Sequence, residues 1–211
     1  DVTGVQTCAL PISSPINWQI IRGETAGGVT LFHLTTDVDA GDIVDSEAYE
    51  IDENDTVADV YNRATISSLS LLDKNWESIH NMKINAIHQN EEDMTLNSRR
   101  RPKDGLIDWS KTSLECHNWI RALTHPYPGA FTYWNNKMVF IWYTKINNSL
   151  VQSDPGTVID AAEKLTIVTG KGCIDILQLQ IENEPICDAK LFIKSYGLQK
   201  NVRFMFKPSN Q

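Results

Sequence analysis

The sequence predicts an α/β layer followed by a mostly β region, and two observations lead to this fold class. In the first half of the chain, strand-like segments alternate with segments of helical period, which is typical of an α/β layer. In the second half, short strand-like segments follow one another at close spacing with no long helix among them. That spacing predicts a small closed barrel.

The first part of the chain contains two predicted helices with strands between them. A helix begins with Pro15 in its first position and ends at Gly23. A strand starts at Gly28, and a further strand covers 48–51. Thr56 then opens a long helix with a capping box and an apolar stripe of helical period, which we expect to pack on a sheet.

An acidic turn, Asp37-Val38-Asp39-Ala40-Gly41-Asp42, interrupts the strand-like stretch 28–44. A carboxylate on a turn that directly follows a strand is held rigidly, which suits a catalytic role. Gly41 allows the backbone to approach a ligand closely. Local chemistry alone favours the plainer interpretation, because most Asp-Gly turns only reverse the chain.

The second part begins with the turn 99–105 and a helix from about 112 to 123. Two prolines and a glycine within 125–129 make the next connection rigid. A hairpin then pairs 131–134 with 138–146. Further strands are expected at 156–159, 165–169 and 173–181.

The composition is that of a globular protein. Its 211 residues suffice for one large domain or two small ones, and an apolar fraction of 41% supports a hydrophobic core. The cysteines show no paired short spacing, so the sequence indicates neither a zinc site nor a disulfide framework. No apolar run approaches the roughly 20 residues that cross a bilayer. We therefore expect a metal-free protein that works in the reducing cytoplasm, away from membranes.

The net charge of −8 is spread unevenly along the chain. Up to Ser98 there are 4 basic and 17 acidic residues, whereas from Arg99 onward there are 15 basic and 10 acidic ones. The step falls at three consecutive arginines, Arg99, Arg100 and Arg101. These side chains either bind the phosphate of a substrate or form a solvated basic linker, and the sequence leaves both interpretations open.

Residues 1–12, DVTGVQTCALPI, stand apart from the rest. No methionine precedes Met82, and the stretch lacks the basic leading segment and long apolar run of a signal peptide. It resembles translated sequencing-adapter DNA, so we expect it to be foreign to the protein. The domains are then expected at 13–106, with a linker at its end, and at 107–211.

Six short motifs occur in a fixed order along the chain. They are SPINW at 14–18, GVTL at 28–31, DAGDIV at 39–44, DGLIDW at 104–109, PYPGAF at 126–131 and PGTV at 155–158. Together they resemble the methionyl-tRNA formyltransferase family, which includes an amino-sugar formyltransferase branch. The resemblance extends from Ser13 to about Phe204.

This resemblance implies a Rossmann-like catalytic domain followed by a small OB-like barrel. It also implies that 10-formyltetrahydrofolate donates a formyl group to a primary amine. The family's catalytic set is an Asn and a His, two residues apart, and the Asp of a DAGD-type turn, which is Asp39 here. In such a reaction an amide and an imidazole stabilise the tetrahedral oxyanion, and the carboxylate orients the imidazole, accepts the amine proton, or does both.

The same match implies further contacts. Those to the folate are Asp37, Val38, Ala40 and Gly41, and those to the acceptor are Asn17, Arg99, Arg100 and Arg101. The acceptor is methionyl-tRNA or a nucleotide-linked amino sugar. The residues of the DGLIDW and PYPGAF regions resemble those of the amino-sugar branch. The basic second half of the chain, by contrast, suits binding to tRNA phosphates.

The chain departs from the family at the Asn and the His. Their matching positions lie near Asp1 and Thr3, and neither residue fits. We therefore expect an inactive C-terminal fragment of a formyltransferase. Two other functions stay open: a 10-formyltetrahydrofolate hydrolase, against which the C-terminal barrel argues, and a non-catalytic nucleic-acid-binding module built on that barrel.

Other conspicuous side chains have plainer interpretations. We expect His33 to be a strand residue, and His117 and His125 to stabilise the end of a helix. Trp134 and Trp142 are expected in the core of the barrel rather than on a base-stacking surface.

Overall fold

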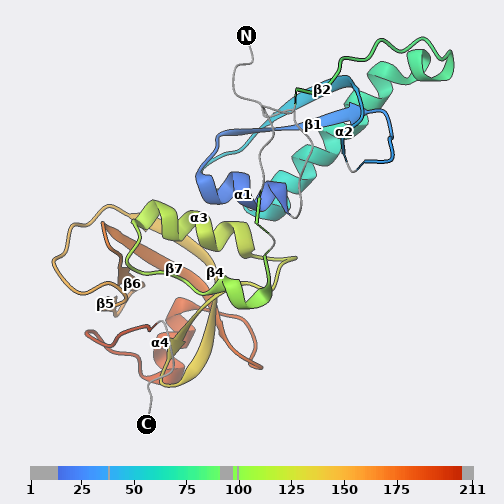
Figure 1. Ribbon diagram of the computed structural model, residues 1–211. Coiled ribbons are helices and arrows are strands. Elements are labelled where there is room, and N and C mark those ends of the chain that lie inside the picture. Colours follow the sequence, from blue (N-terminus) through green and yellow to red (C-terminus); the bar gives the residue numbers. More distant parts are fainter. Residues whose placement is uncertain (1–13, 38, 91–96, 99, 206–211) are drawn as a thin grey trace. The chain divides into compact units, whose positions relative to one another are not determined.

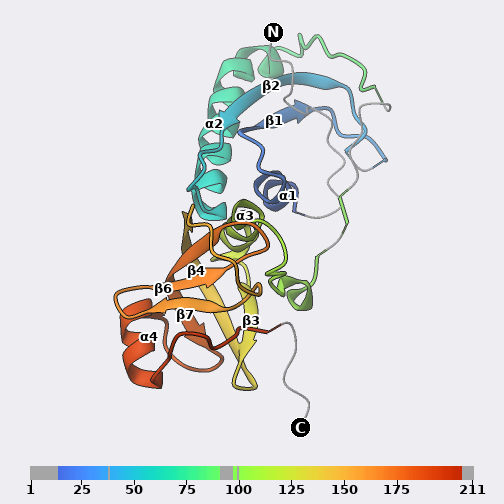
Figure 2. The same ribbon diagram turned by 90° about the vertical axis from the view of Figure 1, so that its left-hand side faces the viewer.

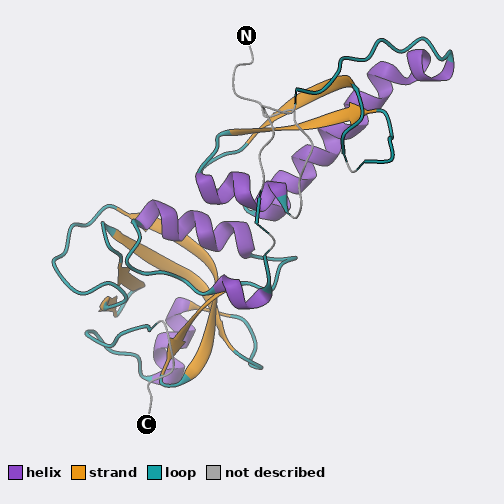
Figure 3. Cartoon of the chain, in the orientation of Figure 1, coloured by secondary structure: helices purple, strands orange, loops and turns teal. Residues whose placement is uncertain are grey.

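The computed structural model describes residues 14–37, 39–90, 97, 98 and 100–205 (Figure 1). It divides into two compact units, of which the first comprises residues up to Gln19 and Glu24–Arg100. The second comprises Ile20–Gly23 and the chain from Arg101 onward. Helices and strands occur in both units (Figure 3), and the named strands pair antiparallel. The fold is therefore mixed α/β, with antiparallel pairing throughout its named strands.

The first unit is built on an antiparallel hairpin. Its elements are α1 (Pro15–Arg22, whose last residues belong to the second unit), β1 (Ala26–Phe32), β2 (Ile43–Glu50) and α2 (Val57–His80). Strand β2 is longer than expected, because it joins the two short extended segments that the sequence suggested. Helix α2 lies alongside both strands of the hairpin (Figure 2).

Helix α2 begins with the capping box that the sequence predicts. The Asp59 backbone N–H donates to Thr56 Oγ1 at 3.4 Å, and the Thr56 N–H donates to Asp59 Oδ2 at 2.8 Å. These two bonds satisfy backbone donors that have no partner within the helix. The face of the helix that packs inward carries Val57, Val60, Ala64, Ser67 and Leu71.

The second unit holds a larger sheet. Its elements are η2 (Pro102–Gly105), α3 (Ser113–Leu123), β3 (Ala130–Trp134), β4 (Lys137–Asn147), β5 (Val158–Ala161), β6 (Leu165–Val168), β7 (Cys173–Ile181), β8 (Cys187–Asp188) and α4 (Ala189–Tyr196). The strands pair in the order β3-β4-β7-β6-β5, and β8 pairs with β7. Helix α3 packs chiefly on β4 and β7 (Figure 1). The predicted helix, hairpin and strands of this part are all present.

A buried aromatic and aliphatic core holds the second unit together. Trp109 is fully buried, and its indole N–H donates to Thr132 Oγ1 at 3.0 Å, so the one polar atom of the ring has a partner. Phe192 and Phe204 both pack against Trp134, with ring centroids 5.7 and 6.4 Å away. Trp134 is therefore a core residue, as expected.

The closed barrel that the sequence predicts is not seen among the named strands, because the edge strands β3 and β5 do not pair with each other. The segment 201–205 lies between them. Tyr133 and Met205 exchange two backbone hydrogen bonds of 3.0 and 2.8 Å, and the Phe204 N–H donates to Gly156 O at 2.9 Å. These are isolated bridges, so the chain connects the two edges without forming a strand.

The sequence predicted a mostly β region in this part of the chain and did not indicate the short helix α4. The Leu191 N–H donates to Asp188 Oδ1 at 2.8 Å, so Asp188 caps the helix, and Gly197 ends it with a left-handed φ of 60°. Ala189 and Phe192 are buried one turn apart. The helix is short, but its caps and its apolar spacing are both present in the sequence.

Candidate functional site

The acidic turn lies between β1 and β2, at the open end of the hairpin. The last residue pair of the strands is Phe32 with Ile43, and one further backbone hydrogen bond, from the His33 N–H to Asp42 O at 3.0 Å, closes the loop. Asp39 is therefore carried by a loop that is anchored on both sides by paired strands.

Asp39 has a left-handed backbone conformation, with φ of 55°. Such a conformation costs most residues roughly 1–2 kcal/mol, and Asp tolerates it better than most. The residue is half-buried. Within the described part of the chain, no side chain is hydrogen-bonded to its carboxylate, so that group is available to a ligand.

Gly41 is required by the packing of the chain on itself. A Cβ atom at this residue would lie 1.6 Å from His33 O, a distance that no real contact allows. Gly41 therefore allows a close approach of the opposite side of the same loop. Replacing this glycine would displace the turn that carries Asp39.

A short segment from the end of the first unit holds the turn from inside. Ile87 exchanges two backbone hydrogen bonds with Ile43, at 2.7 and 2.8 Å. The side-chain amide of Gln89 donates to the carbonyl oxygen of Asp39 at 2.9 Å and to that of Gly41. No local pattern in the sequence indicates this contact, since the partners lie 50 and 48 residues before Gln89.

The neighbouring residues of the turn are placed as follows. Asp37 and Ala40 are exposed, so their backbone and side chains are open to solvent. The Thr35 hydroxyl donates to Asp37 O at 3.1 Å. Val38 lies outside the described residues.

Two of the predicted acceptor contacts, Asn17 and Arg100, lie in the first unit. Asn17, on α1, is buried. Its neighbour Trp18 donates its indole N–H to Ser98 O at 3.1 Å, and the Arg100 guanidinium carbon lies 5.5 Å from the centroid of the Trp18 ring. The guanidinium thus stands over an aromatic face, which holds the side chain without neutralising its charge.

The remaining arginines of this run are less informative. The Arg101 N–H donates to Asp104 Oδ2 at 2.7 Å at the start of η2. Arg99 lies outside the described residues.

Asp45, three residues beyond the turn, is paired with side chains of α2. Asn75 Nδ2 and Lys74 Nζ lie 2.9 and 2.8 Å from its Oδ2, and these bonds hold the pKa of Asp45 below its usual value. A carboxylate that is already paired and ionised fixes α2 against β2 rather than taking up a proton.

The other histidines have structural positions. His117 is buried, with Nδ1 2.8 Å from Thr144 Oγ1. His125 stacks on Trp142, with ring centroids 4.0 Å apart and planes 9° from parallel. His33 is exposed. We expected it within a strand, but β1 ends one residue earlier, at Phe32.

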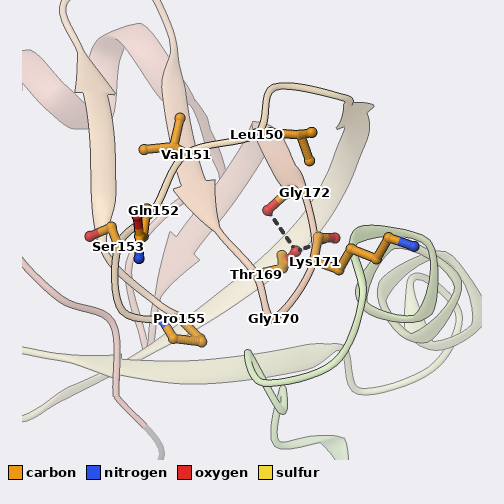
Figure 4. A pocket seen from close by; sticks show the side chains of 9 residues that line it. All are labelled: Leu150, Val151, Gln152, Ser153, Pro155, Thr169, Gly170, Lys171 and Gly172. Atoms are coloured by element: carbon orange, nitrogen blue, oxygen red, sulfur yellow. Dashed lines mark hydrogen bonds between the residues drawn. The ribbon is translucent and has the colours of Figure 1, made fainter.

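A pocket of about 450 Å³ opens in the second unit between the segments 150–155 and 169–172 (Figure 4). Its floor is held by the Thr169 hydroxyl, which hydrogen-bonds the carbonyl oxygens of Lys171 and Gly172 at 3.0 and 2.9 Å. Lys171 is its one charged side chain. None of the predicted site residues lines it, and it holds no acid or base pair.

The described residues include no group of three or more His, Cys, Asp or Glu that could hold a metal ion. In the same ranges, no helix is both long and apolar enough to cross a lipid bilayer.

Comparison with known proteins agrees with the motifs. The family model "Formyl transferase" matches residues 13–72, and the model "Formyl transferase, C-terminal domain" matches residues 100–197. The bifunctional polymyxin resistance protein ArnA of Wigglesworthia glossinidia brevipalpis is 36% identical over 202 residues, which are 90% of this chain and 31% of ArnA. The chain thus spans about a third of the length of this relative.

Two solved structures show the same fold. A variant of HypX from Aquifex aeolicus has a TM-score of 0.68 at 18% identity, covering 90% of this chain and 34% of HypX. An N-formyltransferase from Helicobacter canadensis, in complex with folinic acid and dTDP-3-aminofucose, has a TM-score of 0.62 at 25% identity. That match covers 76% of this chain and 59% of the other. The chain belongs to the formyl transferase family.

Proposed function

We propose that this chain is part of an enzyme that transfers a formyl group from 10-formyltetrahydrofolate to a primary amine. Family membership supports the reaction class, and folinic acid in the Helicobacter canadensis relative supports a folate donor. The observation that carries the proposal is Asp39, which the anchored β1–β2 turn presents with no described side chain bonded to its carboxylate.

In the proposed reaction the amine nitrogen attacks the formyl carbon, and a tetrahedral oxyanion forms. Breakage of the bond between that carbon and N10 of the folate then gives the formamide and tetrahydrofolate. The amine loses one proton, and N10 gains one. Asp39 accepts the amine proton or orients an imidazole that does so. The turn residues Asp37, Val38, Ala40 and Gly41 are proposed to contact the folate, and exposure of Asp37 and Ala40 is compatible with that role.

The preferred acceptor is a nucleotide-linked amino sugar. The Helicobacter canadensis relative, whose structure holds dTDP-3-aminofucose, supports this class. Arg100, fixed over Trp18 in the first unit, offers a guanidinium group that suits a diphosphate, with Arg99, Arg101 and Asn17 as further contacts. The amine of the sugar would then be brought to the formyl carbon.

Methionyl-tRNA is the second candidate acceptor, and the basic character of the chain from Arg99 onward favours it. With this acceptor, the second unit would act as an OB-like platform that binds the tRNA. The hydrogen bonds that the segment 201–205 makes to both sheet edges support such an arrangement.

The chain alone is proposed to be inactive. The family reaction also uses an Asn and a His, and the stretch 1–12, where the match would place them, contains neither. An amide and an imidazole that stabilise the oxyanion account for a large part of such a rate enhancement. Asp39 without them is expected to give no measurable turnover.

The test first recovers the uninterrupted coding sequence upstream of residue 13 from the source DNA. The protein that this sequence encodes, called the recovered enzyme, is then compared with this chain. Both are incubated with 10-formyltetrahydrofolate and either a dTDP-linked 3-amino sugar or methionyl-tRNA. We expect the recovered enzyme to formylate the sugar and this chain to be inactive. Folate cleavage without formylation would instead indicate a hydrolase. No reaction, together with salt-dependent RNA binding by residues 107–211, would indicate a binding module.

A further inference from the structure

We propose that Gln89 is the positioning residue for Asp39, and that it acts by donating both side-chain N–H groups to the turn. This inference rests on the proposed function in one respect, the catalytic role of Asp39. Gln89 itself is not part of any motif in the sequence, and it lies in a stretch that sequence patterns describe only as polar and irregular.

The geometry fits a double donor. Gln89 Nε2 lies 2.9 Å from Asp39 O and also donates to Gly41 O, so one amide nitrogen bridges two carbonyl groups two residues apart. A glutamine amide carries two N–H donors, which matches the two acceptors. The side chain is only 9% exposed, so water does not compete freely for these bonds.

The two carbonyl groups need a donor from outside the turn. The β1–β2 ladder ends with Phe32 and Ile43, followed by the bond from His33 N to Asp42 O. Asp39 and Gly41 lie inside this closed loop, where the strand ladder supplies no N–H to them. Gly41 is buried and Asp39 half-buried, and buried backbone carbonyls are nearly always paired. Gln89 provides a donor for both carbonyls here.

The segment that carries Gln89 is anchored to the hairpin through its backbone. Its anchor is Ile87, which exchanges two hydrogen bonds with Ile43, the first residue of β2. Between them, His88 Nδ1 lies 2.9 Å from Asp42 Oδ1, but these side chains are 86% and 50% exposed. Such an exposed pair contributes little. His88 is therefore a matched control for Gln89, since it lies on the same segment and contacts the same turn.

Residue 89 must donate hydrogen bonds to hold the two carbonyl groups of the turn. Methionine has a similar length and no N–H, so it removes both bonds with little change in volume. An ionised glutamate would face two carbonyl oxygens with a negative charge and repel them. A protonated glutamate has one O–H and restores one of the two bonds. Burial raises the pKa of such a carboxyl group, which brings this switch toward neutral pH.

The first experiment uses this chain and NMR. Wild type, Gln89→Met and His88→Ala are compared through the coupling constants and NOEs that report the left-handed φ of Asp39. We expect Gln89→Met to lose the left-handed pattern while the amide signals of α2 stay in place, and His88→Ala to keep it. A Gln89→Met variant that retains the pattern overturns the inference, whether or not the chain binds folate.

The second experiment uses the recovered enzyme and kcat as a function of pH. We expect Gln89→Met and, at about pH 8, Gln89→Glu to lower kcat on the order of 10- to 100-fold, because small misplacements of a reacting group have effects of that size. As the pH falls, Gln89→Glu is expected to recover relative to Gln89→Met, since its carboxyl becomes a donor. A constant ratio between the two variants contradicts the positioning role. An inactive wild-type enzyme contradicts the proposed function instead, and the NMR result then decides the role of Gln89.

Discussion

The carbonyl oxygen of His33 occupies the space that a side chain on Gly41 would need. A Cβ atom at residue 41 would lie 1.6 Å from that oxygen. The two sides of the acidic turn are therefore in direct backbone contact. This contact and the two bonds from Gln89 together determine how Asp39 is presented.

The substitution Gly41→Ala is expected to destabilise the first unit by about 1–3 kcal/mol, which is typical of inserting a methyl group into a packed site. The backbone on one side of the turn would have to move. Urea unfolding followed through the NMR amide signals of α2, which lies in the first unit, provides the measurement. Ala40→Ser, at an exposed neighbour, is the control and should change little. Equal stability of Gly41→Ala and wild type would contradict the contact.

Helix α4 supplies a second prediction. Phe192 is fully buried and lies 5.7 Å from Trp134 and 4.8 Å from Tyr196 between ring centroids, so Phe192→Ala leaves a cavity in the core. A loss of about 3–5 kcal/mol in the free energy of unfolding is expected. Leu191→Ala removes a side chain that is 52% exposed on the same helix, and should cost much less. Similar losses for both would show that α4 does not pack as described.

The third prediction concerns acid stability. Burial alone would raise the pKa of Asp175, but hydrogen bonds from Lys164, Asn147 and Thr166 outweigh it and hold the pKa below its ordinary value. Because the folded-state pKa is the lower one, the ionised group stabilises the fold above its unfolded-state pKa, and this contribution is lost as the pH falls through the folded-state pKa.

Asp175→Asn should therefore be less stable than wild type at neutral pH, and the difference should shrink below about pH 4. Thermal unfolding of the two proteins between neutral and acidic pH provides the test. Asp154→Asn, which removes an exposed carboxylate, is the control. A difference that stays constant with pH would show that Asp175 acts through packing rather than through its charge.

The fourth prediction concerns Arg100. If its guanidinium binds a diphosphate, Arg100→Gln in the recovered enzyme should weaken dTDP binding and reduce its dependence on salt, because one ionic contact is lost. Isothermal titration calorimetry with dTDP at two salt concentrations measures both the affinity and its dependence on salt. Lys103→Gln, a nearby exposed charge, is the control. Unchanged affinity in Arg100→Gln would leave the arginine with the plain surface role that the sequence also allowed.

Local patterns in the sequence were sufficient for much of the fold. The capping box at Thr56, the helix from about 112 to 123 and the hairpin of 131–134 with 138–146 all depend on patterns that are local in the sequence. Each of these elements appears in the structure where the pattern places it. The motif order also predicted the family, since six motifs in register are more specific than any single one.

Long-range relationships were not accessible in this way. Gln89 contacts Asp39, which lies 50 positions earlier in the chain. The local composition around Gln89 does not indicate this contact. The connection of the two sheet edges by the segment 201–205 depends on isolated bridges rather than on a periodic strand. Helix α4 differs from these cases, because its capping Asp188 and terminal Gly197 are local signals that lie beyond the last predicted strand at 173–181.

The most direct test of the account is the formyl transfer rate of the recovered enzyme with Asp39→Asn, compared with Asp42→Asn. Asparagine keeps the shape of the side chain and its tolerance of a left-handed backbone, but it cannot accept the amine proton. We predict that Asp39→Asn lowers kcat on the order of 10²- to 10⁴-fold, while Asp42→Asn stays within a few-fold of wild type. Full activity of Asp39→Asn, or an equal loss in both variants, would contradict the central role of Asp39.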